Sequence, residues 1–146
     1  MKKKVIISAC LLGENCRYDG KTKQNNQILE AFKNYKIIPF CPEAPIFGTP
    51  RERISVIRID GKNRIITYDT NKDVTRLLED EIYSFIEKNP QADKIILKSK
   101  SPSCGFGTTP ILNEQRDILN YSNGIAAEIF QKSYPNIKIE DENTYL

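Results

Sequence analysis

The sequence contains no histidine among its 146 residues. Histidine is the commonest general base at neutral pH and the commonest nitrogen ligand of metal ions, so its absence excludes both roles. A metal in this protein must therefore be held mainly by sulfur, and thiolate-rich sites favour zinc or iron–sulfur clusters. The sulfur is supplied by four cysteines: Cys10, Cys16, Cys41 and Cys104.

The chain also lacks a run of about 18 apolar residues, so no membrane-spanning helix is expected. Its basic start is followed by too few apolar residues for a signal peptide, and we expect a cytoplasmic protein with reduced cysteines. The net charge is only +3, from 22 basic and 19 acidic residues, which gives no strong signal for nucleic acid. Without repeats or linkers, residues 1–146 are expected to form one domain.

Short apolar runs that alternate with helical patterns predict an α/β fold. Residues 5–8, 36–40 and 94–97 are apolar runs with polar or glycine-containing borders, which is typical of buried strands. Residues 25–35 carry apolar side chains at helical spacing between the first two strands, and this order predicts a parallel pair. We therefore expect a mainly parallel open sheet with helices on both faces.

The remaining patterns add elements around this sheet. A turn signal, Asp60-Gly61-Lys62-Asn63, predicts a hairpin or strand pair, whereas the polar stretch 113–123 has no decisive period. The clearest helix carries apolar residues at i, i+3, i+4, i+8, i+11 and i+12. The hairpin strands, two helices and a short final strand are predicted at residues 54–59 with 64–68, 74–86, 124–134 and 137–139.

Cys10, Cys41 and Cys104 each follow one of the three predicted parallel strands, within a loop. Because the carboxyl ends of parallel strands meet at one edge of a sheet, the three loops are expected to rise together there. We predict that the three thiols converge on one site that holds an iron–sulfur cluster used in enzymatic chemistry. The alternative is that they are small buried hydrophobic residues, as free cysteine often is.

Cys16 lies six residues after Cys10, a spacing unlike the Cys-x2-Cys pairs of ferredoxins and zinc ribbons. Its role is open between a fourth ligand, a sulfur-accepting thiol and a filler. Three classes of protein remain compatible with the cysteines. They are a cluster-dependent enzyme, a non-catalytic sulfur carrier or redox sensor, and a structural zinc domain that uses all four thiols.

Polar residues beside the cysteines favour a catalytic or binding role for this region over a purely structural one. Glu43 is two positions after Cys41 and is either an acid/base or a solvated loop acid. Ser101 and Ser103 precede Cys104, and their hydroxyls either bind the cluster or substrate or shape a turn. Four charged residues near the expected pocket are either ligand contacts or ordinary surface residues: Arg17, Asp19, Arg51 and Lys98.

These residues belong to four motifs. The first is Ser8-Ala9-Cys10-Leu11-Leu12-Gly13 with Cys16-Arg17-Tyr18-Asp19-Gly20, and the second is Cys41-Pro42-Glu43 with Thr49-Pro50-Arg51. The third is Leu97-Lys98 with Ser101-Pro102-Ser103-Cys104-Gly105, and the fourth is Asn123-Gly124-Ile125-Ala126-Ala127. Together they resemble the signatures of the 2-thiouracil desulfurase family, a bacterial family of iron–sulfur desulfidases first described as a domain of unknown function. The resemblance spans roughly residues 5–130. The first and third motifs are specific, and the second is looser.

The resemblance implies an α/β domain that holds a 4Fe-4S cluster through Cys10, Cys41 and Cys104 and leaves one iron open to substrate. In this picture the fourth cysteine is not a ligand. The implied reaction removes sulfur from a thiolated pyrimidine, either a 2-thiouracil-like base or a thiouridine nucleotide, and gives the oxo base and sulfide. Glu43 and Ser101 match positions associated with catalysis, with Glu43 as the acid/base.

The expected substrate contacts are Ser103, Arg17 and Lys98. The second motif departs from the family pattern, because Ala44-Pro45-Ile46-Phe47-Gly48 stands where Gly-Gly-Leu is usual. A carboxylate usual after the arginine is also missing from Arg53-Ile54-Ser55-Val56. These loops shape the expected pocket, so the resemblance leaves the identity of the substrate open.

Overall fold

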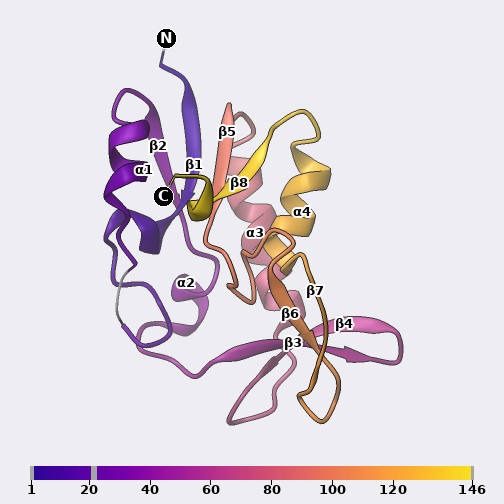
Figure 1. The fold of residues 1–146 in the computed structure, drawn as a ribbon. Helices are drawn as coiled ribbons and strands as arrows, with labels where there is room; N and C mark the ends of the chain where they lie inside the picture. The colour runs from indigo at the N-terminus through magenta and orange to yellow at the C-terminus, as the bar shows by residue number, and fades with distance from the viewer. Residues whose placement is uncertain (1, 21–22, 146) are drawn as a thin grey trace.

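The computed structural model describes residues 2–20 and 23–145, and these residues form two four-stranded sheets with helices packed around them (Figure 1). Sheet A is entirely parallel, and its strands in spatial order are β2 (Lys36–Phe40), β1 (Lys4–Ser8), β5 (Lys94–Leu97) and β8 (Ile139–Asp141). Sheet B is mixed, and its strands in spatial order are β4 (Lys62–Thr67), β3 (Ile54–Ile59), β6 (Thr109–Leu112) and β7 (Ile118–Ser122).

Helices cover both faces of sheet A, and they are α1 (Asn26–Ala31) on one face and α3 (Thr75–Lys88) with α4 (Ile125–Ser133) on the other. Ile28 of α1 packs against Val5, whereas Phe130 of α4 packs on the side of Ile6. Each such fully buried side chain contributes about 1.5–3 kcal/mol, and burial on both faces explains the unbroken apolar runs. The predicted α/β fold with a mainly parallel sheet is confirmed.

None of the helices in the described residues is long and apolar enough to cross a membrane. Several boundaries differ from the predicted ones. The helix predicted to reach residue 35 ends at Ala31, because the chain turns there and the amide of Tyr35 donates to the carbonyl of Phe32 at 3.0 Å. The predicted turn between β3 and β4 shortens to Asp60 and Gly61, whose φ values of 51° and 76° suit a two-residue hairpin.

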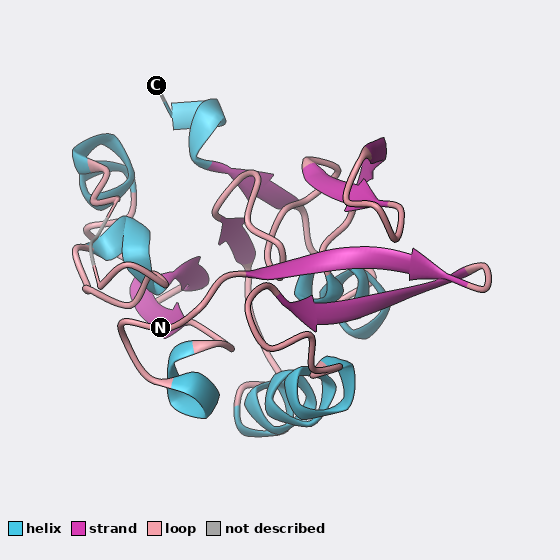
Figure 2. Cartoon of the chain, turned by 90° about the horizontal axis from the view of Figure 1, so that it is seen from below, coloured by secondary structure: helices cyan, strands magenta, loops and turns pink. Residues whose placement is uncertain are grey.

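The sequence patterns predict the first hairpin of sheet B, β3–β4, but not the second hairpin, β6–β7. The stretch 113–123, whose sequence shows no decisive helical or strand period, contains the turn of the second hairpin, β6–β7, and its strand β7. The residues of β7 are exposed or half-buried, so neither face of this strand imposes an alternation of polar and apolar side chains. Figure 2 shows the first hairpin, β3–β4, as a long two-stranded ribbon.

The two hairpins of sheet B interrupt the connections between strands of sheet A. The hairpin β3–β4 lies between β2 and α3, and β6–β7 lies between β5 and α4. The chain therefore leaves the carboxyl end of sheet A through residues 41–53 and again through residues 98–108, and both connections run between the two sheets (Figure 1). The first contains the short helix α2 (Ala44–Phe47), whose Ile46 and Phe47 pack against the core of sheet B.

Backbone hydrogen bonds fix the second connection to the start of α4. The amide of Gly124 donates to the carbonyl of Gly105 at 2.8 Å, and the amide of Ala126 donates to the carbonyl of Ser103 at 2.7 Å. These bonds satisfy amides that the first turn of a helix leaves free. A Cβ on Gly124 would lie 2.6 Å from the carbonyl carbon of Ser103 and 2.7 Å from its oxygen, so the close approach requires glycine.

We predict that Gly124→Ala destabilises the protein by about 1–3 kcal/mol, because the added methyl must displace backbone rather than a flexible side chain. Urea denaturation followed by circular dichroism measures the loss. The control is Ser133→Ala, an exposed position in the last turn of the same helix, which should change stability by less than about 0.5 kcal/mol. Equal stability of Gly124→Ala and the unaltered protein would contradict the close contact.

The end of β5 is held by the C-terminal 3-10 helix η2 (Glu142–Tyr145). The carboxylate of Glu142 accepts hydrogen bonds from the amide and hydroxyl of Ser99 at 2.7 and 2.8 Å, and its ion pair with Lys98 is 2.8 Å long. Burial alone would raise the pKa of Glu142, but the bonds from Lys98 and Ser99 outweigh it and lower this pKa. The ionised carboxylate therefore stabilises the fold.

Glu142→Gln should lower the free energy of unfolding at pH 7 by about 1–2 kcal/mol, because the charged hydrogen bonds are lost. The folded pKa lies below the unfolded value of about 4.3, so this difference should disappear as pH falls through the folded pKa. Urea midpoints between pH 7 and pH 3 provide the measurement. Glu30→Gln, which removes an exposed ion pair with Lys33, should have little effect at any pH.

Candidate active site

A cavity of about 590 Å³ lies at the carboxyl ends of β1, β2 and β5. Its wall is formed by the 3-10 helix η1 (Ala9–Leu12), which follows β1, and by the two connections that lead to sheet B. Because β1 is paired with both β2 and β5, the three strand ends meet at one edge. The volume suits a small molecule. All four cysteines line the cavity: Cys10, Cys16, Cys41 and Cys104.

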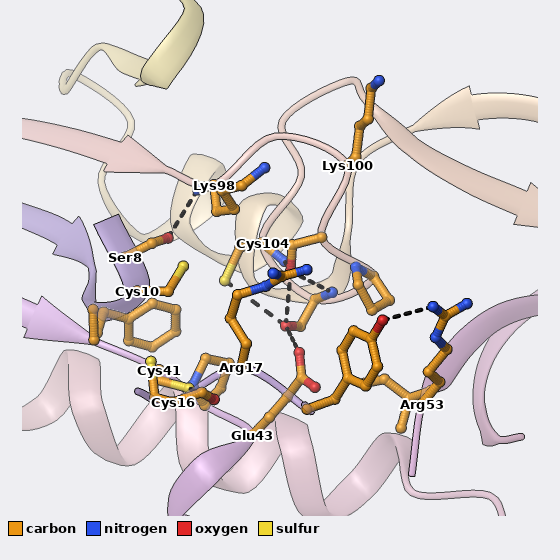
Figure 3. Close-up of a pocket in the computed structure, with 18 of the residues that line it drawn as sticks. Ser8, Cys10, Cys16, Arg17, Cys41, Glu43, Arg53, Lys98, Lys100 and Cys104 are labelled. Carbon is orange, nitrogen blue, oxygen red and sulfur yellow. Dashed lines mark hydrogen bonds between the residues drawn. The ribbon is translucent and has the colours of Figure 1, made fainter. Parts of the chain in front are cut away.

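The four cysteines, all within the described residues, are thiols rather than disulfides. Cys10 belongs to η1 and not to an irregular loop as predicted, and it is buried like Cys104. Figure 3 shows the side chains of these two cysteines pointing into the same space. Cys16 and Cys41 are partly exposed, and the Cys41 thiol donates to the carbonyl oxygen of Cys16 at 3.8 Å. Cys104 Sγ lies 3.8 Å from Ser103 Oγ.

The surroundings of three thiols favour their protonated form. Burial, with the neighbouring Cys41 and Glu43, raises the pKa of Cys104 to about 12. The pKa of Cys16 is raised to about 11, and the largest cause is the hydrogen bond between Cys16 and Cys10. The pKa of Cys41 is also raised, first by Cys16 and then by burial. Thiols of this kind become ligands when a bound metal displaces their protons.

Glu43 is a buried carboxylate whose two oxygens are both held. Its Oε2 accepts a hydrogen bond from the hydroxyl of Ser103 at 2.6 Å. Its Oε1 accepts from the guanidinium of Arg51, with Nε at 3.4 Å and Nη2 at 3.3 Å. Arg51 in turn donates to the carbonyl of Gly48 at 3.0 Å. The side chain of Arg51 is 6% exposed and that of Glu43 is 11% exposed, so water screens this ion pair weakly.

Ser101 shapes the turn that carries Cys104. Its hydroxyl oxygen accepts hydrogen bonds from the amide of Ser103 at 3.3 Å and from the amide of Cys104 at 3.0 Å. The carbonyl of Ser101 accepts from the hydroxyl of Thr109 at 2.7 Å. The side chain therefore has the turn-forming role that was one of the two possibilities from sequence, and it also lines the cavity.

The predicted basic residues line the cavity in different ways. Arg17 is paired with Asp19 at 3.6 Å, and Figure 3 shows its side chain among those that line the cavity. The ammonium group of Lys98 is held at the rim by its ion pair with Glu142. The structure thus brings Arg17 and Lys98 to one cavity but leaves Lys98 tied to a partner outside it.

Several lining residues were not predicted as site residues, among them Tyr18, Arg53 and Lys100. Arg53 Nη2 lies 2.6 Å from the hydroxyl oxygen of Tyr18, and its guanidinium carbon lies 4.8 Å from the centre of that ring. Tyr18 could have been found, since it stands between Arg17 and Asp19 in the first motif. In total five basic side chains and one carboxylate line the cavity, which favours an electron-rich or anionic ligand.

Among the described residues, no group of three histidine, cysteine, aspartate or glutamate side chains is arranged to hold a single metal ion. The four thiols instead line one larger cavity. This arrangement gives no support to a structural zinc site, whose ligands must all lie within bonding distance of one ion.

Comparisons with known proteins test the resemblance of the motifs. The family model for 2-thiouracil desulfurase matches residues 5–142. An uncharacterized protein, YbbK of Bacillus subtilis (strain 168), is 33% identical in an alignment of 112 positions that covers 70% of this chain and 74% of YbbK. A solved structure of the 4Fe-4S-dependent thiouracil desulfidase TudS matches with a TM-score of 0.73 and 28% identity, over 98% of this chain and 93% of TudS. The resemblance of the motifs is thereby confirmed, and the chain belongs to the 2-thiouracil desulfurase family.

Proposed function

We propose that this protein is an enzyme that holds a 4Fe-4S cluster and removes sulfur from a thiolated pyrimidine, giving the oxo base and sulfide. The observation that carries the proposal is the convergence of Cys10, Cys41 and Cys104, from three strand ends, on one cavity that also contains the carboxylate of Glu43. Membership of the family and the likeness to TudS support it. A reducing cytoplasm would keep these thiols available.

The residues of the cavity fit an iron–sulfur cluster. Soft thiolates are the donors that such clusters take, and histidine, which a zinc or mononuclear iron site would often use, is absent from the chain. The three thiols line a cavity of about 590 Å³, which leaves room for both a multinuclear group and a small substrate. We assign Cys10, Cys41 and Cys104 as the ligands.

When bound, a cluster with three protein ligands supplies one iron with a coordination position that can take the sulfur of a substrate. The net reaction is a hydrolysis: a C=S group and water give C=O and hydrogen sulfide, with no change in the number of electrons. The protein must therefore deliver a water molecule and manage its protons. Without histidine, this task falls to another group in the cavity.

We assign the proton transfer to Glu43, which accepts a proton from the attacking water and passes it to the departing sulfide. Arg51 and Ser103 each hold one of its oxygens and so fix the direction in which the carboxylate faces. Pro42 stiffens the link to Cys41 and keeps the carboxylate close to the ligand. Ser101 is proposed to assist, because its hydroxyl lines the cavity beside Cys104.

The pyrimidine is proposed to lie over Arg17, whose guanidinium can donate to a ring carbonyl or another electron-rich edge. Lys98 is proposed to contribute positive charge from the rim. Ser103 was predicted to bind the substrate, but its side chain is fully buried and its hydroxyl donates to Glu43. We therefore propose that Ser103 acts on the substrate through this carboxylate.

The choice of ligands predicts different iron contents for two cysteine variants. Cys16→Ala should keep the cluster, whereas Cys104→Ala should lose it, because Cys104 is the proposed ligand on the β5 side of the cavity. Iron and sulfide per chain, measured after anaerobic purification, test this. Equal loss of iron in both variants would favour a site with four cysteine ligands instead.

Glu43→Gln should keep iron but lower turnover of 2-thiouracil, used as the test substrate, by about 10²–10⁴-fold, which is the usual contribution of a positioned acid/base. Sulfide release measures turnover. Glu87→Gln, an exposed position on α3, is the matched control and should retain full activity. Loss of iron in Glu43→Gln would make Glu43 structural, and unchanged turnover would remove it from the mechanism.

A further inference from the structure

Cys16 belongs to the same cavity as the proposed ligands, yet the proposed function leaves it without a role. It reaches the site because the chain turns back directly after η1, where Gly13 takes a φ of 96°. The amide of Glu14 then donates to the carbonyl of Ala9 at 3.3 Å, and the amide of Lys23 donates to the carbonyl of Cys10 at 3.0 Å. The ordered turn places Cys16 beside its neighbours before any ligand binds.

The contacts of Cys16 are all on the β1–β2 side of the cavity. Its thiol is hydrogen-bonded with the thiols of Cys10 and Cys41, and its carbonyl oxygen accepts from the Cys41 thiol at 3.8 Å. Cys104 lies on the β5 side and has hydrogen bonds with Ser103 and Ser8. Cys16 is therefore close to two of the three proposed ligands but is differently placed from the third.

A second cavity, of about 480 Å³, adjoins the first on this side. Cys16 and Cys41 line both cavities, whereas Cys10 and Cys104 line only the first. These two partly exposed thiols thus form part of the wall between the two cavities, together with Ala9 and Phe40. Cys41 is consequently the proposed ligand that is most open to attack from outside, and Cys16 is the thiol next to it.

We propose that Cys16 is a reserve ligand, meaning a thiol that binds the cluster in place of Cys41 or Cys10 when one of these is lost. The exchange needs only that Cys16 gives up its proton and binds the iron that its neighbour has left, without any oxidation or reduction. Soft thiolate in the vacated position would keep the cluster attached. No other cysteine is available to replace Cys104. The inference depends on the proposed function, because it assumes the three-cysteine cluster.

The experiment compares Cys41→Ala with Cys104→Ala, and alanine is used because serine can itself bind iron. Each variant, the double variant Cys16→Ala/Cys41→Ala and the unaltered protein are reconstituted anaerobically with ferrous iron and sulfide. Iron per chain is measured, and iodoacetamide labelling of each cysteine is followed by mass spectrometry. Circular dichroism confirms that every variant is folded.

Cys41→Ala should keep most of its iron, while Cys104→Ala and the double variant should keep almost none. In loaded Cys41→Ala the alkylation of Cys16 should be roughly tenfold slower than in the loaded unaltered protein, because the thiolate is bound to iron. Removal of iron with a chelator should restore the labelling. This protection is a readout that does not depend on enzymatic activity.

The inference is overturned if Cys41→Ala is as poor in iron as Cys104→Ala. It is overturned equally if Cys41→Ala keeps iron while Cys16 is labelled as fast as in the unaltered protein, since another donor would then fill the position. Failure of the proposed function looks different. In that case the unaltered protein takes up no cluster, or Cys104→Ala takes up as much iron as the unaltered protein.

Discussion

The parallel pairing of β1 with both β2 and β5 is the constraint on which the site depends. It brings the ends of three strands to one edge of sheet A, and each end is followed within a few residues by a cysteine. The side chains that hold this pairing, such as Ile6 and Ile7, are fully buried between helices on both faces. Cys10 and Cys104 lie within the buried clusters on the two faces of this sheet, but larger apolar side chains make up most of both clusters. The positions of the thiols follow from a sheet that other residues stabilise.

Sheet B constrains the site in a second way. The two long connections leave sheet A to reach it, and the cavity lies between them. The β2–β3 connection is held by Ile46 and Phe47, which pack against the core of sheet B, and the β5–β6 connection is held by its backbone hydrogen bonds to the start of α4. The hydrogen bond from Ser103 to Glu43 then joins one connection to the other across the cavity. A carboxylate held in this way from two segments is suited to act in a fixed direction, which a proton-transferring group requires.

The sequence predicts the elements that are buried and fails for those that are not. The strands of sheet A are visible as apolar runs, and their order alone places Cys10, Cys41 and Cys104 together. In sheet B the hairpin β3–β4 is predicted as well, whereas β6–β7 is not, because β7 exposes Ile118, Leu119 and Tyr121 and so has no buried face that would produce a pattern. The network of Glu43 with Ser103 and Arg51 depends on contacts between residues up to 60 positions apart, which local patterns do not record. Arg53 was missed for the same reason, since its role depends on the ring of Tyr18.

The most direct test of the account is iron anomalous scattering from crystals of the anaerobically reconstituted protein. The account predicts a cluster of four irons in the cavity, with bonds from the sulfur atoms of Cys10, Cys41 and Cys104 and none from Cys16. A single metal ion, or a cluster bonded to all four cysteines, would contradict it.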